Sequence, residues 1–292
     1  MNLESSLIGK SSLIKKLRKE IPRLAKFNHI LLIGEKGAGK SLIARLIHEA
    51  SKSKRSILNS LTPSEENIKE TFEKSNTDTT IFIQEIEGFS FLNQGIIAHV
   101  IDSLSKKLSP KIIITAKKNI QQLKKEGTLL DSLYDTLNTF DEAEIPPLSE
   151  RTEDIPLLVE HFMNNACERI GTELKVIDIN ALDFLVRREW KENILELKSV
   201  IEKSVLTSEN ETIELPKYLV DEYVQLSGIM SNIEKKKAFS FDKSLSNLEK
   251  TLIEKTLEAV SHNQTKAAEI LNITDANLRY RLRKFKILTS KK

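Results

Sequence analysis

The sequence predicts an α/β fold with a parallel sheet, followed by two all-helical regions. Before residue 148, short apolar runs rich in β-branched residues alternate with helical patterns. This alternation is typical of parallel strands that are covered by helices on both faces. From Ser149 onward strand patterns nearly vanish and helical spacing dominates. Residues 264–285 show two short helical patterns joined by a tight turn, which indicates a separate helical module at the C-terminal end.

The expected elements alternate along the first region and are helical after it. Strand patterns occur in short runs at residues 29–33, 56–59, 80–84 and 111–115. Helical patterns cover residues 11–27, 40–51, 93–106, 153–170, 178–189, 192–206, 244–260, 264–271 and 275–285. Changes in composition divide the chain into an α/β region at 1–148, a helical region at 149–225, a linker at 226–242 and a second helical region at 243–292.

A complete phosphate-loop pattern, GxxxxGK[ST], lies directly after the first strand pattern. It consists of Gly34, Glu35, Lys36, Gly37, Ala38, Gly39, Lys40 and Ser41. The loop also opens a helical pattern, and this strand–loop–helix context is the one the motif requires. Backbone N–H groups of such a loop surround a phosphate, the lysine reaches the β- and γ-phosphates, and the hydroxyl is placed for Mg²⁺. We therefore predict nucleotide binding; the alternative is a glycine-rich turn without a ligand.

The composition excludes several classes of protein. The chain holds 45 Lys and Arg against 42 Asp and Glu, with 39% hydrophobic residues, which is typical of a soluble globular protein. No apolar run approaches the length of a membrane span and the N-terminus lacks a secretion signal pattern, so we expect a cytoplasmic protein with no membrane partner. The single cysteine, Cys167, excludes an internal disulfide framework. The five histidines form no ligand spacing, so no metal is expected beyond Mg²⁺ carried with a nucleotide.

Positive charge gathers at the C-terminal end. Residues 261–292 hold eight Lys and Arg and two acids, so this segment has a net charge of +6. The whole chain has a net charge of only +3. Asn272 can adopt the left-handed conformation that ends a helix, and Thr274 is a suitable N-cap for the next one. Leu278 and Leu282 then lie on the inward face of the second helix, which leaves amide, aromatic and guanidinium groups outside. This pattern predicts a helix-turn-helix.

The residues expected to contact double-stranded DNA are Thr265, Lys266, Thr274, Asn277, Arg279, Tyr280, Arg281, Arg283 and Lys284. Arginine suits guanine edges and phosphates, and asparagine suits adenine edges. The alternative is a small helical dimerisation module with a solvated basic face, and the two roles are compatible because such modules commonly form dimers.

On these residues the chain resembles, over nearly its full length, the AAA+ enhancer-binding activators of bacterial sigma-54 transcription. The most specific stretch is residues 145–156, residues 190–197 resemble the lid motif, and residues 263–271 are similar to the Fis-type helix-turn-helix. The resemblance implies that residues 149–225 form an AAA+ lid and that residues 243–292 bind DNA. No receiver or sensory domain is expected before residue 7. Besides the phosphate loop, the resemblance implies nucleotide contacts at Ile8, Gly9, Leu42 and Gln84.

The candidate catalytic residues, if the chain hydrolyses a nucleotide, are Glu85 and Asn59. Glu85 matches the family's water-activating carboxylate, and Asn59 matches the asparagine that switches it. The family's metal-binding aspartate, however, falls on the neutral amide of Gln84. The sequence therefore retains only part of the hydrolytic set.

Further departures concern the groups that contact the terminal phosphate. The two arginine-finger positions are Leu130 and Thr136, the first sensor is Lys117, and the lid arginine falls on Leu195. An arginine finger is worth about 10³–10⁵ in the rate of related phosphoryl transfer. We therefore expect binding of ATP or ADP with weak or absent hydrolysis. The alternative is that Lys117 or Lys118 acts as a substitute finger.

The sequence also lacks the loop by which this family contacts sigma-54. From Lys40 to Gln84 the separation is 84 − 40 = 44 residues, too few for the loop that carries GAFTGA, and that hexapeptide does not occur in the chain. We therefore expect a DNA-binding transcriptional regulator that binds ATP or ADP with Mg²⁺ and acts independently of sigma-54. Two alternatives stay open: an active AAA+ ATPase that remodels an unidentified partner, and a structural subunit that modulates hexamers of an intact relative. Expected partners are double-stranded DNA, further copies in a dimer or hexamer, and RNA polymerase or a related AAA+ protein.

Overall fold

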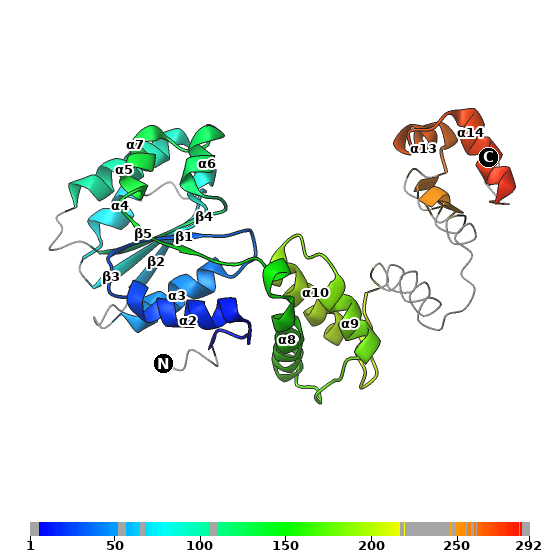
Figure 1. The fold of residues 1–292 in the computed structure, drawn as a ribbon, viewed down its shortest axis with the longest axis horizontal. Coiled ribbons are helices and arrows are strands. Elements are labelled where there is room, and N and C mark those ends of the chain that lie inside the picture. The colour runs from blue at the N-terminus through cyan, green and yellow to red at the C-terminus, as the bar shows by residue number, and fades with distance from the viewer. Residues whose placement is uncertain are drawn as a thin grey trace. The chain divides into compact units, whose positions relative to one another are not determined.

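A computed structural model describes most of the chain. It covers residues 6–51, 57–64, 68–76, 78–104, 110–216, 219, 246, 249–250, 252–254, 256–257, 260, 262–285 and 287. The chain divides into two compact units, residues 1–217 and residues 218–292 (Figure 1). Each unit is described by itself.

The first unit is built on a five-stranded parallel sheet with the strand order β2-β3-β4-β1-β5. The strands are β1 (His29–Ile33), β2 (Ile57–Leu61), β3 (Thr79–Ile83), β4 (Lys111–Ala116) and β5 (Asp141–Glu144). In the register, Ile30 of β1 lies opposite Ile113 of β4 and Asp141 of β5. The parallel sheet expected from the sequence is confirmed, and β1, which leads into the phosphate loop, has a paired strand on each side.

Helices cover both faces of this sheet (Figure 1). Alternate residues of β1 point to opposite sides: Ile30 and Leu32 belong to one apolar cluster, Leu31 and Ile33 to the other. The first cluster includes the buried faces of α2 (Ser12–Leu24) and α3 (Lys40–Ala50). The second is covered by α4 (Ile68–Glu73), α5 (Phe91–Ser103), α6 (Ile120–Lys125) and α7 (Asp131–Leu137). Burial on both faces explains why the central strands are continuous apolar runs.

The rest of the first unit is helical. A short 3-10 segment, η2 (Leu148–Asp154), leads into α8 (Ile155–Ile170), which is followed by α9 (Ile179–Arg187) and α10 (Asn193–Thr207). Helices α8 and α10 pack against each other, and the Trp190 Nε1–H donates to the Leu185 carbonyl at 3.0 Å. The helical patterns predicted here are confirmed with ends shifted by one or two residues.

The second unit contains α13 (Gln264–Ile270) and α14 (Asp275–Lys284). Its apolar core joins Ala267, Ala268, Leu278 and Leu282 to residues of the preceding predicted helix. Of that helix, expected at 244–260, the described residues 246, 249–250, 252–254 and 256–257 are helical. Among the described residues no helix is both long enough and apolar enough to cross a membrane.

Candidate functional site

A cavity of about 500 Å³ lies where the phosphate loop, the end of β3 and the helical part of the first unit meet. The predicted contacts that line it are Ile8, Lys36, Gly37, Ala38, Gly39, Lys40, Ser41, Leu42, Gln84 and Glu85. Gly9, Gly34 and Glu35 line neighbouring hollows instead. The other walls include Arg151 of η2, His161 of α8 and Leu195 of α10. The structure therefore brings most of the predicted nucleotide contacts into one cavity.

The glycines of the loop are required by its backbone. Gly37 and Gly39 have φ angles of 73° and 112°, in the left-handed region that side chains disfavour. A Cβ atom on Gly37 would lie 2.0 Å from the carbonyl oxygen of Glu192, so the loop also approaches the helical region too closely for a side chain. This shape points backbone N–H groups inward at the start of α3, where the helix dipole favours an anion.

The side chain of Lys40 is held inside the loop. It is 7% exposed, and its ammonium donates to the backbone oxygens of Gly34 and Glu35, the latter at 2.9 Å. Burial lowers the pKa of this lysine, while the nearby carboxylates of Glu85 and Glu87 oppose that shift. The loop therefore presents a partly desolvated positive charge to the cavity, which is the environment in which an anionic phosphate binds most strongly.

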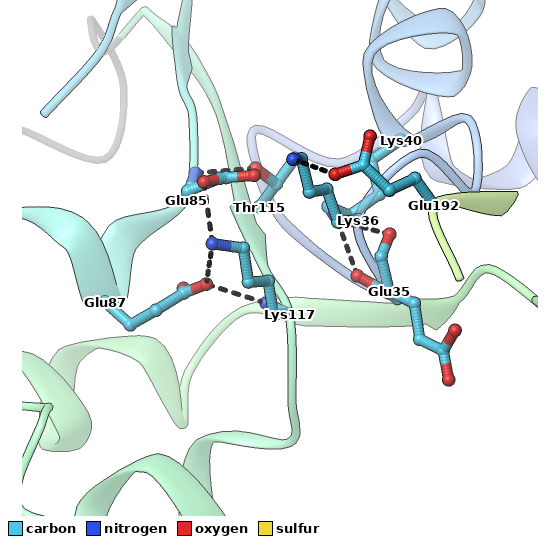
Figure 2. A network of polar contacts seen from close by, with 9 residues as sticks. Glu35, Lys36, Lys40, Glu85, Glu87, Thr115, Lys117 and Glu192 are labelled. Carbon is cyan, nitrogen blue, oxygen red and sulfur yellow. Dashed lines mark hydrogen bonds and ion pairs between the residues drawn. The ribbon is translucent and has the colours of Figure 1, made fainter. Parts of the chain in front are cut away.

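Asn193 ties the loop to the helical region. Its Nδ2 donates to the Glu35 carboxylate and to the Lys36 carbonyl, both at 3.0 Å, and its Oδ1 accepts from the Leu148 backbone N–H at 2.7 Å. The residue is 1% exposed and has a φ of 51°, a conformation that asparagine tolerates better than most residues. The Lys36 ammonium also pairs with the Glu192 carboxylate (Figure 2). These contacts hold the loop in its shape.

Two buried charged side chains of η2 support the opposite wall. Arg151, which is 2% exposed, donates through Nη2 to the Ala38 carbonyl at 2.7 Å, and burial lowers the pKa of its guanidinium. Asp154 accepts from the N–H groups of Lys10 and Ser11 and from the Ser11 hydroxyl at 2.6–2.8 Å. A Cβ on Gly9 would lie 2.7 Å from Asp154 Oδ2, which explains the glycine in the N-terminal segment. Arg151 and Asp154 lie in the stretch 145–156 that resembles the family most specifically, but the sequence alone does not reveal their roles.

The edge of the cavity formed by Gln84 and Glu85 is called here the hydrolytic edge, and Lys117 borders it from a neighbouring hollow. Its ammonium lies 2.9 Å from Glu85 Oε2 and 4.0 Å from Glu87 Oε1, and its backbone N–H donates to Glu87 Oε1 at 3.2 Å. Figure 2 shows the lysine between these two glutamates. Burial raises the pKa of the Glu87 carboxyl group. Glu85 itself has a φ of 52°, and its N–H donates to Thr115 Oγ1 at 2.9 Å. The candidate base is thus ion-paired and held by a constrained backbone.

The donor groups at this edge do not fit a magnesium ion bound by the protein. The Gln84 amide supplies no charge, and its Nε2 donates to Ser60 Oγ at 2.6 Å. Glu85 is the one carboxylate among the described residues that line the cavity, and Lys117 neutralises it. Mg²⁺ prefers carboxylate and phosphate oxygens in octahedral geometry. The chain therefore offers the Ser41 hydroxyl, and Mg²⁺ carried by a nucleotide stays a prediction.

The remaining predicted positions lie on several elements of the first unit. Thr136, at one finger position, is 6% exposed and donates to Asp102 Oδ1 at 3.1 Å, while Leu130, at the other, packs against the apolar core. Leu195 is 49% exposed at the cavity wall. Lys118 pairs with Glu126 at 2.7 Å. Asn59 lies on β2 opposite Ile81, but its side chain is outside the described part of the structure. Of the two candidates for a substitute finger, Lys117 lies beside the candidate base Glu85, whereas Lys118 pairs with Glu126.

The second unit presents the predicted DNA-contacting residues on one helix pair. Asn263 caps α13 through Lys266 N–H at 3.1 Å, Thr274 caps α14 through Asn277 N–H at 3.2 Å, and Asn272 has a φ of 52°. The turn and cap expected from the sequence are confirmed. The exposed members of the predicted surface are Thr265, Lys266, Thr274, Asn277, Arg279, Tyr280, Arg283 and Lys284.

Arg281 differs from its neighbours on α14. Its guanidinium forms an ion pair with Glu249 on the preceding helix and donates through Nε to Asn277 Oδ1 at 2.8 Å. Lys284 also approaches Glu249, at 3.4 Å. Within the described residues, Arg279 and Arg283 are therefore the arginines of α14 whose charge is presented outward without an ion pair in the unit. The sequence of α14 alone does not distinguish Arg281 from the other two arginines, because its partner Glu249 lies on another helix.

The comparisons with known proteins cover almost the whole chain. Residues 8–148 match the sigma-54 interaction domain, residues 149–227 the AAA+ ATPase lid domain, and residues 244–285 the Fis family of bacterial regulatory proteins. The phenol regulator MopR of Acinetobacter guillouiae is 28% identical over 87% of this chain and 51% of that protein. The DNA-binding transcriptional regulator NtrC of Azospirillum brasilense is 28% identical over 95% of this chain and 69% of that protein. The chain spans about half the length of the first of these relatives.

Solved structures with the same fold include two AAA+-type proteins. NtrX from Brucella abortus in complex with ADP aligns with a TM-score of 0.64 at 23% identity, covering 98% of this chain and 70% of that one. The Thermotoga maritima RuvB Holliday junction branch migration motor aligns with a TM-score of 0.52 at 13% identity, covering 97% and 90%. At these identities the likeness establishes the fold.

Proposed function

Because the chain belongs to the bacterial family that joins a sigma-54 interaction domain and an AAA+ lid to a Fis-type helix-turn-helix, we propose that it is a transcriptional regulator that binds ATP or ADP and double-stranded DNA. The observation that carries the nucleotide part is the complete phosphate loop with its buried Lys40, held open by Asn193 and Arg151. A loop kept in this shape needs little reorganisation to receive a phosphate.

Hydrolysis is proposed to be weak or absent. Gln84 supplies no charge for a metal, the finger positions carry Leu130 and Thr136, and Lys117 occupies the carboxylate of Glu85. These groups act mainly on the charge that develops in the transition state, whereas ground-state binding rests on the loop. Nucleotide occupancy would then favour one oligomeric state, a dimer or hexamer, through binding free energy instead of turnover.

Regulation is proposed to be independent of sigma-54, because the chain lacks the GAFTGA loop that the resemblance requires for that contact. The protein would act as a repressor, or in a mixed assembly with RNA polymerase or a related AAA+ protein. A working ATPase is the second candidate function, and the observation that favours it is the retained Glu85 at the cavity wall.

Nucleotide binding is tested with a fluorescent ATP analogue. We expect Lys40→Ala to abolish binding, because it removes the buried ammonium that faces the phosphates. We expect Lys74→Ala, which changes an exposed lysine just after α4, to bind like the wild type. Equal affinity of wild type and Lys40→Ala would contradict the proposal. Steady phosphate release far above the Lys40→Ala background would favour the ATPase instead.

DNA binding is tested on operator fragments recovered from genome-wide mapping of bound sites. Arg279→Ala and Arg283→Ala are each expected to cost about 1–3 kcal/mol of binding free energy. Arg187→Ala, on the surface of α9, is the matched control and should bind normally. Unchanged affinity of both helix variants across a salt titration would overturn the assignment of α14 as the recognition helix.

A further inference from the structure

The charges at the hydrolytic edge raise the question of how this chain neutralises a nucleotide. The family's pattern places two carboxylates beside a divalent cation, so that the protein groups and the metal balance one another. Here Gln84 removes one of those negative charges, and Lys117 adds a positive charge 2.9 Å from the carboxylate that remains. The pair is already neutral before any metal arrives.

A metal ion would gain little at this edge. It would have to approach the ammonium of Lys117 or displace it from Glu85, and like charges repel each other at such short range. It would find the neutral Gln84 amide in the place of an acid, with that amide already bonded to Ser60. The donor set therefore disagrees with the Mg²⁺ requirement that the resemblance implies.

Lys117 is in the right place to supply the missing charge itself. Its side chain is 40% exposed and lines a hollow next to the cavity, its ammonium pairs with Glu85 at the cavity wall, and its charge contributes to lowering the pKa of Lys40 in the phosphate loop. Its backbone is fixed by the bond from its N–H to Glu87 Oε1 at 3.2 Å, at the end of β4. The side chain lies between the two glutamates (Figure 2).

We propose that Lys117 takes the place of the divalent cation, so that this chain binds the phosphates of ATP or ADP without requiring Mg²⁺. The inference rests on the proposed nucleotide binding and deepens it. Lysine binds phosphate as a point charge and needs no octahedral ligand shell. The same substitution explains how the chain keeps a usable nucleotide site after losing its metal-binding acid at position 84.

The test measures the affinity of the full chain for a fluorescent ATP analogue with Mg²⁺ and with excess EDTA. We expect the wild type to bind with affinities that differ by less than about threefold between the two conditions. We expect the affinity of Lys117→Asn in EDTA to be weaker by about tenfold or more, because a hydrogen bond to a charged group is lost. With Mg²⁺ its affinity should recover in part. Lys117→Arg should stay independent of the metal because it keeps the charge.

Two further variants separate this idea from simpler ones. Lys118→Asn changes the adjacent lysine, which pairs with Glu126, and should behave like the wild type. Gln84→Asp should make binding depend on Mg²⁺, because it restores the acid. A wild-type affinity that collapses in EDTA, or a Lys117→Asn variant that matches the wild type there, would overturn the inference while leaving the proposed nucleotide binding intact. Absence of binding in both conditions would overturn both.

Discussion

The two ends of the cavity are held in different ways. At the loop end, Lys40, Asn193 and Arg151 are nearly fully buried, and most of their hydrogen bonds go to backbone carbonyls and N–H groups. At the hydrolytic edge, Gln84, Glu85 and Lys117 are half-exposed, and their side chains pair mainly with other side chains. Bonds from buried side chains to backbone fix a shape, whereas half-exposed pairs are worth little to stability.

This difference teaches which part of the cavity is constrained by folding. A change at the loop end alters the packing of the helical region on the sheet, so it affects stability and binding together. The hydrolytic edge can change with little effect on the fold, which is where the chain departs from its family's pattern.

The largest effect is expected at Asp154. Asp154→Ala leaves the N–H groups of Lys10 and Ser11 and the Ser11 hydroxyl without their buried acceptor. We expect a loss of about 3–5 kcal/mol in the free energy of unfolding, measured by urea denaturation. The neighbouring exposed acid provides the control, since Glu153→Ala should change stability by about 0.5 kcal/mol or less. If Asp154→Ala lowered the free energy of unfolding no more than Glu153→Ala does, the buried side chains around the cavity would not be the ones that stabilise the fold.

An intermediate effect is expected at Asn193, with Gln84 as its counterpart at the other edge. Asn193→Ala should lower the unfolding free energy by about 2–3 kcal/mol and weaken nucleotide binding, because three hydrogen bonds are lost. Asn193→Gly should be less harmful, since glycine accepts the φ of 51°. Gln84→Ala removes one bond to Ser60 and should cost about 1 kcal/mol or less. Equal losses at both positions would remove the distinction between the two ends.

The smallest effect is expected at Glu87 and depends on pH. Burial raises the pKa of this carboxyl group in the folded chain, so its ionised form is disfavoured there. Stability from this group is therefore greatest below the pKa of the unfolded chain and is lost as the pH rises through the folded value. Glu87→Gln should be more stable than the wild type at pH 7, by about 1 kcal/mol or less, and the difference should close near pH 4. A variant that is less stable at pH 7 would contradict this sign.

Much of the fold could be predicted because its central elements are strongly patterned. The strands β1, β3 and β4 are mostly apolar and are buried at nearly every position, as cover on both faces demands. The sequence does not predict the acidic strand β5, because Asp141–Glu144 has no strand pattern. This strand pairs with β1 at the edge of the sheet. The short helices α4, α6 and α7 were missed for a similar reason, because helices of this length depend on tertiary contacts.

The candidate site was predictable where its chemistry is local. The phosphate loop is one continuous motif, so the sequence alone identifies Lys40 and Ser41. The supporting residues have distant partners: Arg151 lies 113 residues from Ala38 and Asn193 lies 157 residues from Lys36. Lys117 was noticed as a departure, but its pairing with Glu85 depends on the juxtaposition of β3 and β4. Because Arg151 and Asn193 both stand among other charged and polar residues, the sequence alone does not mark them out.

Asn193 has a mechanical consequence for the first unit. Its side chain forms hydrogen bonds to Lys36 of the phosphate loop and to Leu148 at the start of η2. The residue itself lies in the first turn of α10. None of these three segments can swing away alone without breaking hydrogen bonds that the others share. The junction between the sheet and the helices is therefore rigid. A displacement of the loop would also displace α10.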